Sequence, residues 1–550
     1  MSENKIRRYI KYAVGTAFVF LLFLWPLLNM FSEAFIAKDE GFTFAYFANV
    51  LSDAGFAKVI TNTLLINICS MVSAGIVGVF LAYVMAYTDI AFKNILHKLL
   101  LIPLFIPSYI VTLAWMQLCM KNGLLYQLTH FELYSYKGII LMFTVCQYPI
   151  VYLMCLSHFR RIPRELEQAA VVSGCGRVKA FFKVVLPITK ITIVNAMLLV
   201  FLSCLDNFGI VAFIGIPANI NVLSTDIYKT IVSSTKDSYN IAAVKGIVLS
   251  VLAVIMMLAT QWLSGNNKAE NCEKEDMEPR IMLGKWKFVL AGVMSCFIGM
   301  FNIFPLIKLV SSALTKGQGV KLSLKTMCFD NFFKVLRNVK SMNGIKNSIF
   351  LALMAVLLCT VIGITISYLS EYKKDRIASG IQAVVTFPYS IPGIILGLAM
   401  ILTYAGSFHG FTIYGTIWIL LLSYVIRFTA VSLRYANSAF AQLDTSMDEA
   451  AQISGANNYV KWKKVIIPLS IGTISAGMGL VMIYSMMELT TSSLLWSGGT
   501  ETIGVVIFNF TSAGLSNMAS AYSSIIMIGV CAVAVLLKVI DKSVRTIRRR

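Results

Sequence analysis

Long apolar runs separated by short polar segments dominate the chain. The first extends from Tyr12 to Met30, and later runs centre near residues 73, 108, 148, 202 and 252, then near 300, 357, 391, 423, 482 and 529. Because an apolar helix of about 20 residues crosses a bilayer, the pattern predicts an all-α integral membrane protein with about twelve transmembrane helices. No small-residue cleavage site follows the first run, so we expect it to be retained as a helix.

The apolar runs fall into two groups of equal size. Residues 264–287 lie between the groups and are polar and charged without hydrophobic periodicity, which is typical of a flexible linker. We therefore predict a first six-span repeat at residues 1–263, a cytoplasmic linker at 264–287 and a second six-span repeat at 288–550.

The composition excludes a soluble protein. Of the 550 residues, 58% are hydrophobic and 13% are charged, whereas about a quarter of the residues in a soluble domain are charged. The 11 cysteines are scattered, mostly within the apolar runs, without a Cys-x-x-Cys pair. They therefore predict buried apolar side chains rather than disulfides or a metal site.

Basic residues predict the orientation in the membrane. The net charge is +21, and the basic residues concentrate at both termini and at 158–190, 371–376 and 427–464. The loop at 32–58 carries more acidic than basic residues, whereas the loop at 313–343 departs from the rule with several lysines. Since basic loops stay on the cytoplasmic side, we expect both termini in the cytoplasm and no nucleic-acid binding.

A stretch of the first half recurs in the second half. Residues 167–174 read EQAAVVSG and residues 448–455 read DEAAQISG, and an apolar-Pro pair follows each at 186–187 and 467–468. The separation of Gly174 and Gly455, here named the loop offset, is also the separation of the two prolines of these pairs.

A second shared pattern with two prolines lies earlier in each half, at 102–107 and 387–392. The separation of Pro107 and Pro392, here named the early offset, is only slightly larger than the loop offset. Two copies of the same patterns in the same orientation, each with an even number of spans, predict parallel repeats.

The repeated stretch predicts a short surface helix that ends at a glycine. Ala169 and Ala170 provide a face of small side chains that another backbone can approach, and acidic residues favour the helix N-terminus. Gly174 and Gly455 permit a sharp turn after the helix. A single copy could equally be an amphipathic connector on the membrane, but two matched copies favour docking of two copies of a cytosolic partner.

The pattern Glu-Ala-Ala, three residues, Gly and a later hydrophobic-Pro pair resembles the cytoplasmic EAA loop of ATP-binding-cassette importer permeases of type I. The resemblance implies coupling loops near 163–188 and 444–469 that dock on two ATPase subunits, an extracytoplasmic binding protein, and a bacterial inner membrane. The family's loop residues correspond to Glu167, Ala169, Ala170 and Gly174, and to Glu449, Ala450, Ala451 and Gly455. The first loop departs from the pattern, because Gln168 stands where the second has Glu449.

The fused two-repeat layout is similar to that of the ferric-iron permease subgroup, which also includes thiamine and aminoethylphosphonate permeases. The supporting residues lie at 206–211, 224–228 and 488–495. The resemblance implies ferric iron as the cargo, with thiamine or aminoethylphosphonate as alternatives. Asn207 interrupts the subgroup's usual Asp-Phe-Gly, and Thr490 stands where proline is common.

Two carboxylates lie inside apolar runs at places that the repeat makes equivalent. Asp206 follows Pro187, and Glu488 follows Pro468, at spacings that differ by a single position. Because a carboxylate in a span is costly and usually faces a cavity or a partner, one hypothesis is that both line the translocation path and favour a cation. The alternative is that each caps a local helix break or accepts hydrogen bonds from nearby backbone.

The sequence contains no Gly-x-x-x-x-Gly-Lys-[Ser/Thr] motif, so the ATP and Mg²⁺ implied by the family belong to partner subunits, and no cofactor is expected on this chain. The four histidines are isolated, and we find neither a metal-ligand cluster nor a catalytic nucleophile with its base. We therefore predict a permease rather than an enzyme. A carrier driven by an ion gradient is the alternative from another class, and it would not need paired docking loops.

Overall fold

The computed structural model describes residues 15–530 except for 18, 38–40, 121–123, 234, 236, 266–275, 321, 407–411 and 445. The basic residues of both termini, including Arg7, Arg8 and Arg548–Arg550, lie outside the described residues, as do residues 266–275 of the polar linker segment. The predicted orientation of the termini therefore stays a prediction.

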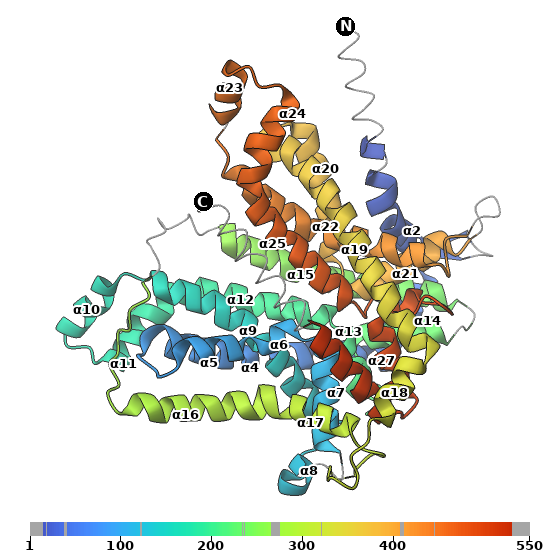
Figure 1. The fold of residues 1–550 in the computed structure, drawn as a ribbon. Helices are drawn as coiled ribbons and strands as arrows, with labels where there is room; N and C mark the ends of the chain where they lie inside the picture. The colour runs from blue at the N-terminus through green and yellow to red at the C-terminus, as the bar shows by residue number, and fades with distance from the viewer. Residues whose placement is uncertain are drawn as a thin grey trace. The chain divides into compact units, whose positions relative to one another are not determined.

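The regular secondary structure of the described residues is helical, apart from two isolated β-bridges and an antiparallel hairpin of two-residue strands, β1 (Ile36–Ala37) and β2 (Gly41–Phe42). By their contacts they form two units: unit 1 comprises the described residues within Met1–Phe56, Asp226–Ala253 and Val339–Val506, and unit 2 comprises those within Ala57–Thr225, Val254–Asn338 and Ile507–Arg550. Figure 1 labels the helices.

The helices within unit 1 are η1 (Phe20–Leu24), α2 (Trp25–Glu33), α3 (Ala45–Ser52), α19 (Val339–Ser367), η4 (Tyr368–Tyr372), α20 (Arg376–Thr386), η5 (Phe387–Ser390), α21 (Gly393–Tyr404), α22 (Ile417–Ala441), α23 (Ser446–Ile453), α24 (Asn458–Lys461), η6 (Trp462–Ile466), α25 (Ile467–Met486) and α26 (Ser492–Leu495). Those within unit 2 are α5 (Lys93–Leu100), α6 (Ile102–Phe105), α7 (Ser108–Cys119), α8 (Leu124–Thr129), α9 (Tyr136–Arg161), α10 (Arg164–Val172), α11 (Arg177–Ala180), η2 (Phe181–Val185), α12 (Leu186–Asp206), α13 (Phe208–Ile214), α16 (Trp286–Ile298), η3 (Gly299–Ile303), α17 (Phe304–Ala313) and α18 (Asp330–Arg337). The helices that run from one unit into the other are α4 (Ala54–Tyr87), α14 (Leu223–Val232), α15 (Ser238–Gly265) and α27 (Ile503–Ser512).

Each unit combines the middle of one half of the sequence with the ends of the other half. In unit 1, α2 from the first half packs on α21 from the second, and the Asn29 amide donates to the Leu402 carbonyl at 3.2 Å. In unit 2, α17 from the second half packs on α7 from the first. The two units therefore do not coincide with the two halves, although each holds one copy of the repeated stretch.

The fold class is that of a helical membrane protein. Among the described residues, helices long and apolar enough to cross a membrane occur at Gly15–Glu33, Ala54–Tyr87, Tyr136–Arg161, Phe181–Asp206, Ser238–Leu263, Trp286–Ala313, Val339–Tyr372, Ile417–Ala441 and Asn458–Met486. These are 9 candidate spans, or 10 if the bent pair Arg376–Ser390 and Gly393–Tyr404 is counted as one more. The number of about twelve stays a prediction.

The apolar runs near 108 and 391 are not continuous helices. Ile106 and Ile391, which precede Pro107 and Pro392, have extended backbone, because a proline disfavours helical geometry in the residue before it. The second run bends by 107° at this point. The apolar run near 529 is not among the candidate spans, because it continues past residue 530, where the described residues end.

Local structure repeats at the offsets seen in the sequence. The N-caps of α3 and α18, Phe44 and Phe329, are separated by the early offset and have φ of −99° and −100°. The π-helical segments η2 and η6 are separated by the loop offset, and each leads into a helix with proline at its second position. Both halves therefore carry the same local structures in the same order.

Two glycines at equivalent places allow close helix packing. A Cβ on Gly78 of α4 would lie 2.6 Å from Cβ of Val151 on α9, and a Cβ on Gly363 of α19 would lie 2.6 Å from Oγ of Ser432 on α22. Real Cβ atoms essentially never come this near to another heavy atom. Each pair of long helices therefore crosses where only a glycine fits.

The short helix α18 has two different exposed faces. Phe333 and Leu336, with Phe329 at the N-cap, are exposed apolar side chains at helical spacing. Lys334 and Arg337 are exposed on another side of the same helix. Since α18 immediately precedes the candidate span that begins with α19, this two-sided surface is typical of a helix at a membrane surface.

Candidate functional site

The first repeated loop forms the helix α10, whose ends are set by proline and glycine. Pro163 is its N-cap, and Gly174 follows its C-terminus with φ +84°. The Cys175 N–H donates to the Ala170 carbonyl and the Gly174 N–H to the Val171 carbonyl, both at 3.0 Å. This pair of bonds is the Schellman arrangement, which requires a left-handed residue. The sharp turn predicted at Gly174 is therefore confirmed.

The small residues of α10 are open to solvent. None of its residues, all of which are described, is buried, and Ala169 is exposed while Ala170 is half-buried. Figure 1 shows α10 and α11 at one end of unit 2, beyond the ends of α9 and α12. The helix thus presents its small face outward, where another protein can reach it.

The second repeated loop forms α23 in unit 1. Gly455 has φ +74°, so the turn predicted at this glycine is also confirmed. Ala450 is exposed, and the Ser454 N–H donates to its carbonyl at 3.1 Å. The side chains of Glu449 and Ala451 lie outside the described part of the chain.

Each loop is joined to the candidate spans by a cluster of four aromatic rings. In unit 2 the ring centroid of Phe181 lies 4.3 Å from that of Tyr83 and 6.1 Å from that of Phe159, and Tyr87 completes the cluster. The corresponding cluster in unit 1 consists of Tyr368, Tyr372, Phe440 and Trp462, with Trp462 4.7 Å from Tyr368.

The two aromatic clusters occupy equivalent positions of the repeat. Tyr83 and Tyr87 are separated from Tyr368 and Tyr372 by the early offset. Phe159 and Phe181 are separated from Phe440 and Trp462 by the loop offset. The sequence comparison missed these residues, although the constant offsets could have found them.

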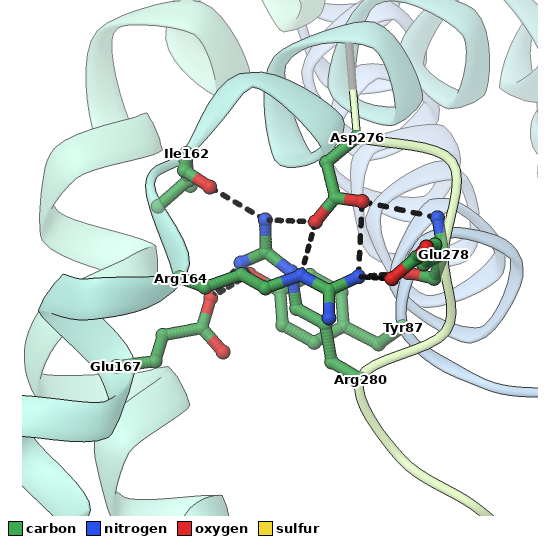
Figure 2. Close-up of polar contacts among 7 residues, drawn as sticks. All are labelled: Tyr87, Ile162, Arg164, Glu167, Asp276, Glu278 and Arg280. Carbon is green, nitrogen blue, oxygen red and sulfur yellow. Dashed lines mark hydrogen bonds and ion pairs between the residues drawn. The ribbon is translucent and has the colours of Figure 1, made fainter.

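The carboxylate of Glu167 in the first turn of α10 has two partners (Figure 2). The Tyr87 hydroxyl donates to Glu167 Oε1 at 2.6 Å, and Arg280 Nη1 forms an ion pair with the same oxygen. Arg280 Nη2 also donates to the Ile162 carbonyl at 2.5 Å, and its guanidinium carbon lies 4.9 Å from the centroid of the Tyr87 ring. Arg280 therefore binds the start of α10 and the end of α4 at the same time.

A second ion pair joins the start of α10 to the segment that carries Arg280. Arg164, the first residue of α10, pairs through Nε with Asp276 Oδ2 and donates from Nη2 to Asp276 Oδ1 at 2.9 Å. This hydrogen bonding lowers the pKa of the Asp276 carboxyl below its ordinary value and raises the pKa of Arg164. Arg164 Nη2 also donates to the Glu278 carbonyl at 3.1 Å.

Residues 276–283, here named the linker strap, are held by backbone bonds as well. The Asp276 N–H donates to the Arg160 carbonyl, and the N–H groups of Arg280 and Ile281 donate to the Tyr87 carbonyl, all at 2.8 Å. The Leu283 N–H donates to Asp89 Oδ1 at 2.7 Å. The expectation of a flexible linker is therefore wrong for these residues, because the ends of α4 and α9 supply acceptors for their backbone.

The two predicted intramembrane carboxylates have different surroundings. Asp206 is the last residue of α12 and is half-buried. Glu488 is 7% exposed, accepts the Thr491 N–H at 2.7 Å and lies 3.6 Å from Nε of Arg427. The Glu488 carboxylate therefore accepts a hydrogen bond from nearby backbone, and its place in the translocation path stays a hypothesis.

The structural counterpart of Glu488 in the first half is Asn207, not Asp206. The Asn207 side chain accepts the N–H of Ile210 at 3.0 Å, three residues on, just as Glu488 accepts that of Thr491. Asn207 and Glu488 are separated by the loop offset. The equivalence expected between Asp206 and Glu488 is therefore wrong by one residue.

Both caps lie beside the break in the neighbouring apolar run. Asn207 Nδ2 donates to Oγ of Ser108, the residue after Pro107, at 2.9 Å. In unit 1, Arg427 Nη1 donates to Thr491 Oγ1 at 3.1 Å, and a Cβ on Gly393, the residue after Pro392, would lie 1.4 Å from that nitrogen. In unit 2 the Asn207 side chain thus holds the helix that starts after the break, and in unit 1 the Thr491 hydroxyl donates to the Gly393 carbonyl at 3.5 Å.

Another matched pair of polar residues was missed by the sequence comparison. Thr63 Oγ1 accepts the Leu223 N–H, and Ser348 Oγ, one early offset later, accepts the Ile503 N–H, both at 2.9 Å. The preceding residues, Asn62 and Asn347, donate to loop carbonyls close to these N–H groups. The signal that could have found them is an Asn-hydroxyl pair recurring at the early offset.

Among the residues that the structure describes, no group of three or more His, Cys, Asp or Glu side chains could hold a metal ion. The polar groups of the site instead form ion pairs and caps, which can hold one segment against another or release it.

Comparison with known proteins gives a family and a set of relatives. The family described as "Binding-protein-dependent transport system inner membrane component" matches residues 74–266 and 343–550. The chain is 21% identical over 476 residues to the Fe(3+)-transport system permease protein FbpB 2 of Haemophilus influenzae, covering 86% of this chain and 88% of the relative. It is 22% identical over 549 residues to the ferric transport system permease protein FbpB of Actinobacillus pleuropneumoniae, covering 94% of this chain and 75% of the relative.

Among solved structures, the chain is similar to a chain of a bacterial alginate transporter in complex with an alginate pentasaccharide-bound periplasmic protein. The sequence identity is 19%, the TM-score is 0.40, and the match covers 48% of this chain and 96% of that chain.

Proposed function

The chain belongs to the family of binding-protein-dependent transport system inner membrane components, and we propose that it forms the translocation path by which an ATP-driven importer brings ferric iron into the cell. As a member of this family it is a multi-pass permease component of the inner membrane and not an enzyme, and it needs no cofactor of its own. The extracytoplasmic binding protein implied by the family name delivers the cargo, and separate ATPase subunits hydrolyse ATP.

The observation that carries the coupling part of the proposal is the pair of exposed helices ended by left-handed glycines. One ATPase subunit docks on α10 and a second on α23. The aromatic clusters support this assignment, since each joins a loop to two long helices and can transmit a rigid-body shift of the loop. Closure of the ATPase dimer then moves the two loops together and reorganises the spans.

The cargo rests on the relatives. Two permeases whose names state ferric transport align with most of this chain at 21% and 22% identity. Asp206 remains a candidate for the translocation path, whereas the contacts of Glu488 with the Thr491 N–H and with Arg427 support a structural role. An Asp206→Asn variant with normal expression and an undiminished uptake rate would remove Asp206 from the path.

The loops are tested by strain at the two glycines. No atom lies within 4 Å of a Cβ added to Gly174 or Gly455, so the cost of a valine at either place comes from its left-handed backbone, about 1–2 kcal/mol for each. We expect the double variant Gly174→Val/Gly455→Val to lose uptake and to retain less ATPase subunit on purification. The matched control is Gly176→Val, which lies in the same loop, also meets no atom within 4 Å and lacks the positive φ.

The cargo is tested by whole-cell uptake of labelled ferric iron and, separately, labelled thiamine, in the intact strain, the deletion strain and the double variant. Loss of iron uptake in both mutants supports the cargo and the coupling loops together. Loss of thiamine uptake with intact iron uptake would overturn the cargo and keep the loops. Iron uptake that survives in the double variant but not in the deletion would overturn the assignment of the loops.

A further inference from the structure

The linker strap is attached to the first loop more closely than a connection between two halves requires. Its residues contact α10 and the chain just before it at the Ile162 carbonyl, at Arg164 and at Glu167. The same segment is bonded through its backbone to the ends of α4 and α9. The start of α10 is thus held to the candidate spans by residues from a distant part of the chain.

Arg280 is the centre of this attachment (Figure 2). Its side chain is 9% exposed and that of Glu167 is 18% exposed, whereas Arg164 and Asp276 are 32% and 26% exposed. Solvent screens the outer pair more strongly, so the inner pair contributes more to the position of α10. The fixed fork of a guanidinium lets Arg280 bind a carboxylate and a carbonyl together, which an ammonium group does not reproduce.

Tyr87 connects this ion pair to the aromatic cluster. Its hydroxyl donates to Glu167, and its ring lies under the Arg280 guanidinium and beside Phe159. Any tilt of α10 away from α4 must therefore break the bonds of Glu167 to both Tyr87 and Arg280.

We propose that Arg280 is a positioning residue for ATP coupling: through Glu167 and Ile162 it holds the first coupling loop in the orientation that accepts an ATPase subunit. The inference rests on the proposed function and goes beyond it. It gives the linker strap, which connects the two halves of the chain, a role in forming the surface on which the ATPase subunit docks. The first loop takes its orientation from a segment that is distant in the sequence.

The test uses the full chain, reconstituted in lipid nanodiscs with its ATPase subunits and its binding protein. Basal ATP hydrolysis, hydrolysis stimulated by the loaded binding protein and amide hydrogen exchange of α10 are measured for Arg280→Ala and Arg280→Lys. Lys285→Ala is the matched control, because it removes an exposed cation close to the strap. Exchange in α12 serves as an internal standard for global loss of structure.

We expect Arg280→Ala to reduce the stimulated rate by about ten-fold, as expected from losing a hydrogen-bonded charge pair, and to accelerate exchange in α10 but not in α12. Arg280→Lys should recover part of the stimulation, because it keeps the charge near Glu167. The double exchange Glu167→Arg/Arg280→Glu should recover more stimulation than either single change. Lys285→Ala should behave like the unmodified chain.

Full stimulation in Arg280→Ala, whatever the exchange of α10, would overturn the proposal and leave the importer assignment in place. Equal loss in Arg280→Ala and Lys285→Ala would also overturn it, since a cation anywhere near the strap would then suffice. Absence of stimulation in the unmodified chain would instead contradict the proposed function, and this inference with it.

Discussion

Replacing Gly393 by alanine tests how the break in the second apolar run is held. Gly393 is the first residue of α21, after the 107° bend. A Cβ at this position would lie 1.4 Å from Nη1 and 2.5 Å from Cζ of Arg427, and 3.0 Å from Oγ1 of Thr491. Since the first two separations are far below contact distance, the guanidinium at the end of the Arg427 side chain must shift away from Gly393, and we expect this shift to break its pairing with Glu488.

The cost follows from what Arg427 leaves behind. Glu488 has a side chain that is 6% exposed and pairs with Arg427. Removing one partner of a buried ion pair destabilises a protein by about 3–5 kcal/mol, because the remaining charge stays buried. The backbone adds no strain, since Gly393 has no positive φ.

Gly380→Ala is the matched control on the other side of the same break. Gly380 lies in α20, and no atom lies within 4 Å of its added Cβ. The alanine there should be neutral or should stabilise the helix by up to about 1 kcal/mol. The two substitutions are chemically identical, so their difference isolates the loss of the Arg427 site.

The measurement is thermal denaturation of the detergent-purified chain, and its readout is the fraction of the protein that stays monodisperse after heating. At about 2 °C for each kcal/mol in a large domain, Gly393→Ala should denature roughly 6 °C or more below Gly380→Ala. Adding Glu488→Gln to Gly393→Ala should restore part of the loss, since it removes the unpaired charge. Equal denaturation temperatures for the two alanine variants would refute the reasoning.

Three further results are expected. Asn347→Ala should destabilise the chain by about 1–3 kcal/mol in the same assay, because its amide donates to the carbonyls of Gly499 and Glu501, both at 2.9 Å; no change would mean that these bonds contribute nothing. Arg164 lowers the pKa of the Asp276 carboxyl. The stabilisation of the folded loop by the Arg164–Asp276 pair is therefore complete above the ordinary carboxyl pKa of about 4, and it is lost as the pH falls through the lowered pKa. The difference in α10 hydrogen exchange between the unmodified chain and Asp276→Asn should therefore be the same at pH 8 and pH 5.5, and a difference that disappears by pH 6 would contradict this. A tryptophan in place of Phe333 should be quenched by brominated lipid more strongly than one in place of Lys334, and equal quenching would place α18 away from the membrane surface.

Several features could be predicted from the sequence because they depend on local chemistry. The apolar runs predict membrane-spanning helices, since the cost of burying unpaired backbone polar groups in lipid acts on each segment separately. The turns at Gly174 and Gly455 follow from the freedom of glycine at positive φ. The close approach at Gly78 is likewise a property of the one residue type without a Cβ.

The tertiary structure alone decided which distant groups meet. Nothing in the polar segment distinguishes Arg280 from its neighbours until α10 and α4 place the Glu167 carboxylate and the Tyr87 ring around it. In the same way, Glu488 is one more carboxylate in a span until Arg427 and the backbone after it form its surroundings. Hydrophobic pattern reports how buried a segment is, and residue type reports which backbone it tolerates, but a hydrogen bond also needs a partner that folding brings within about 3 Å. The ion pairs and caps of this chain join residues that the pattern does not relate, and so they appeared only in the folded structure.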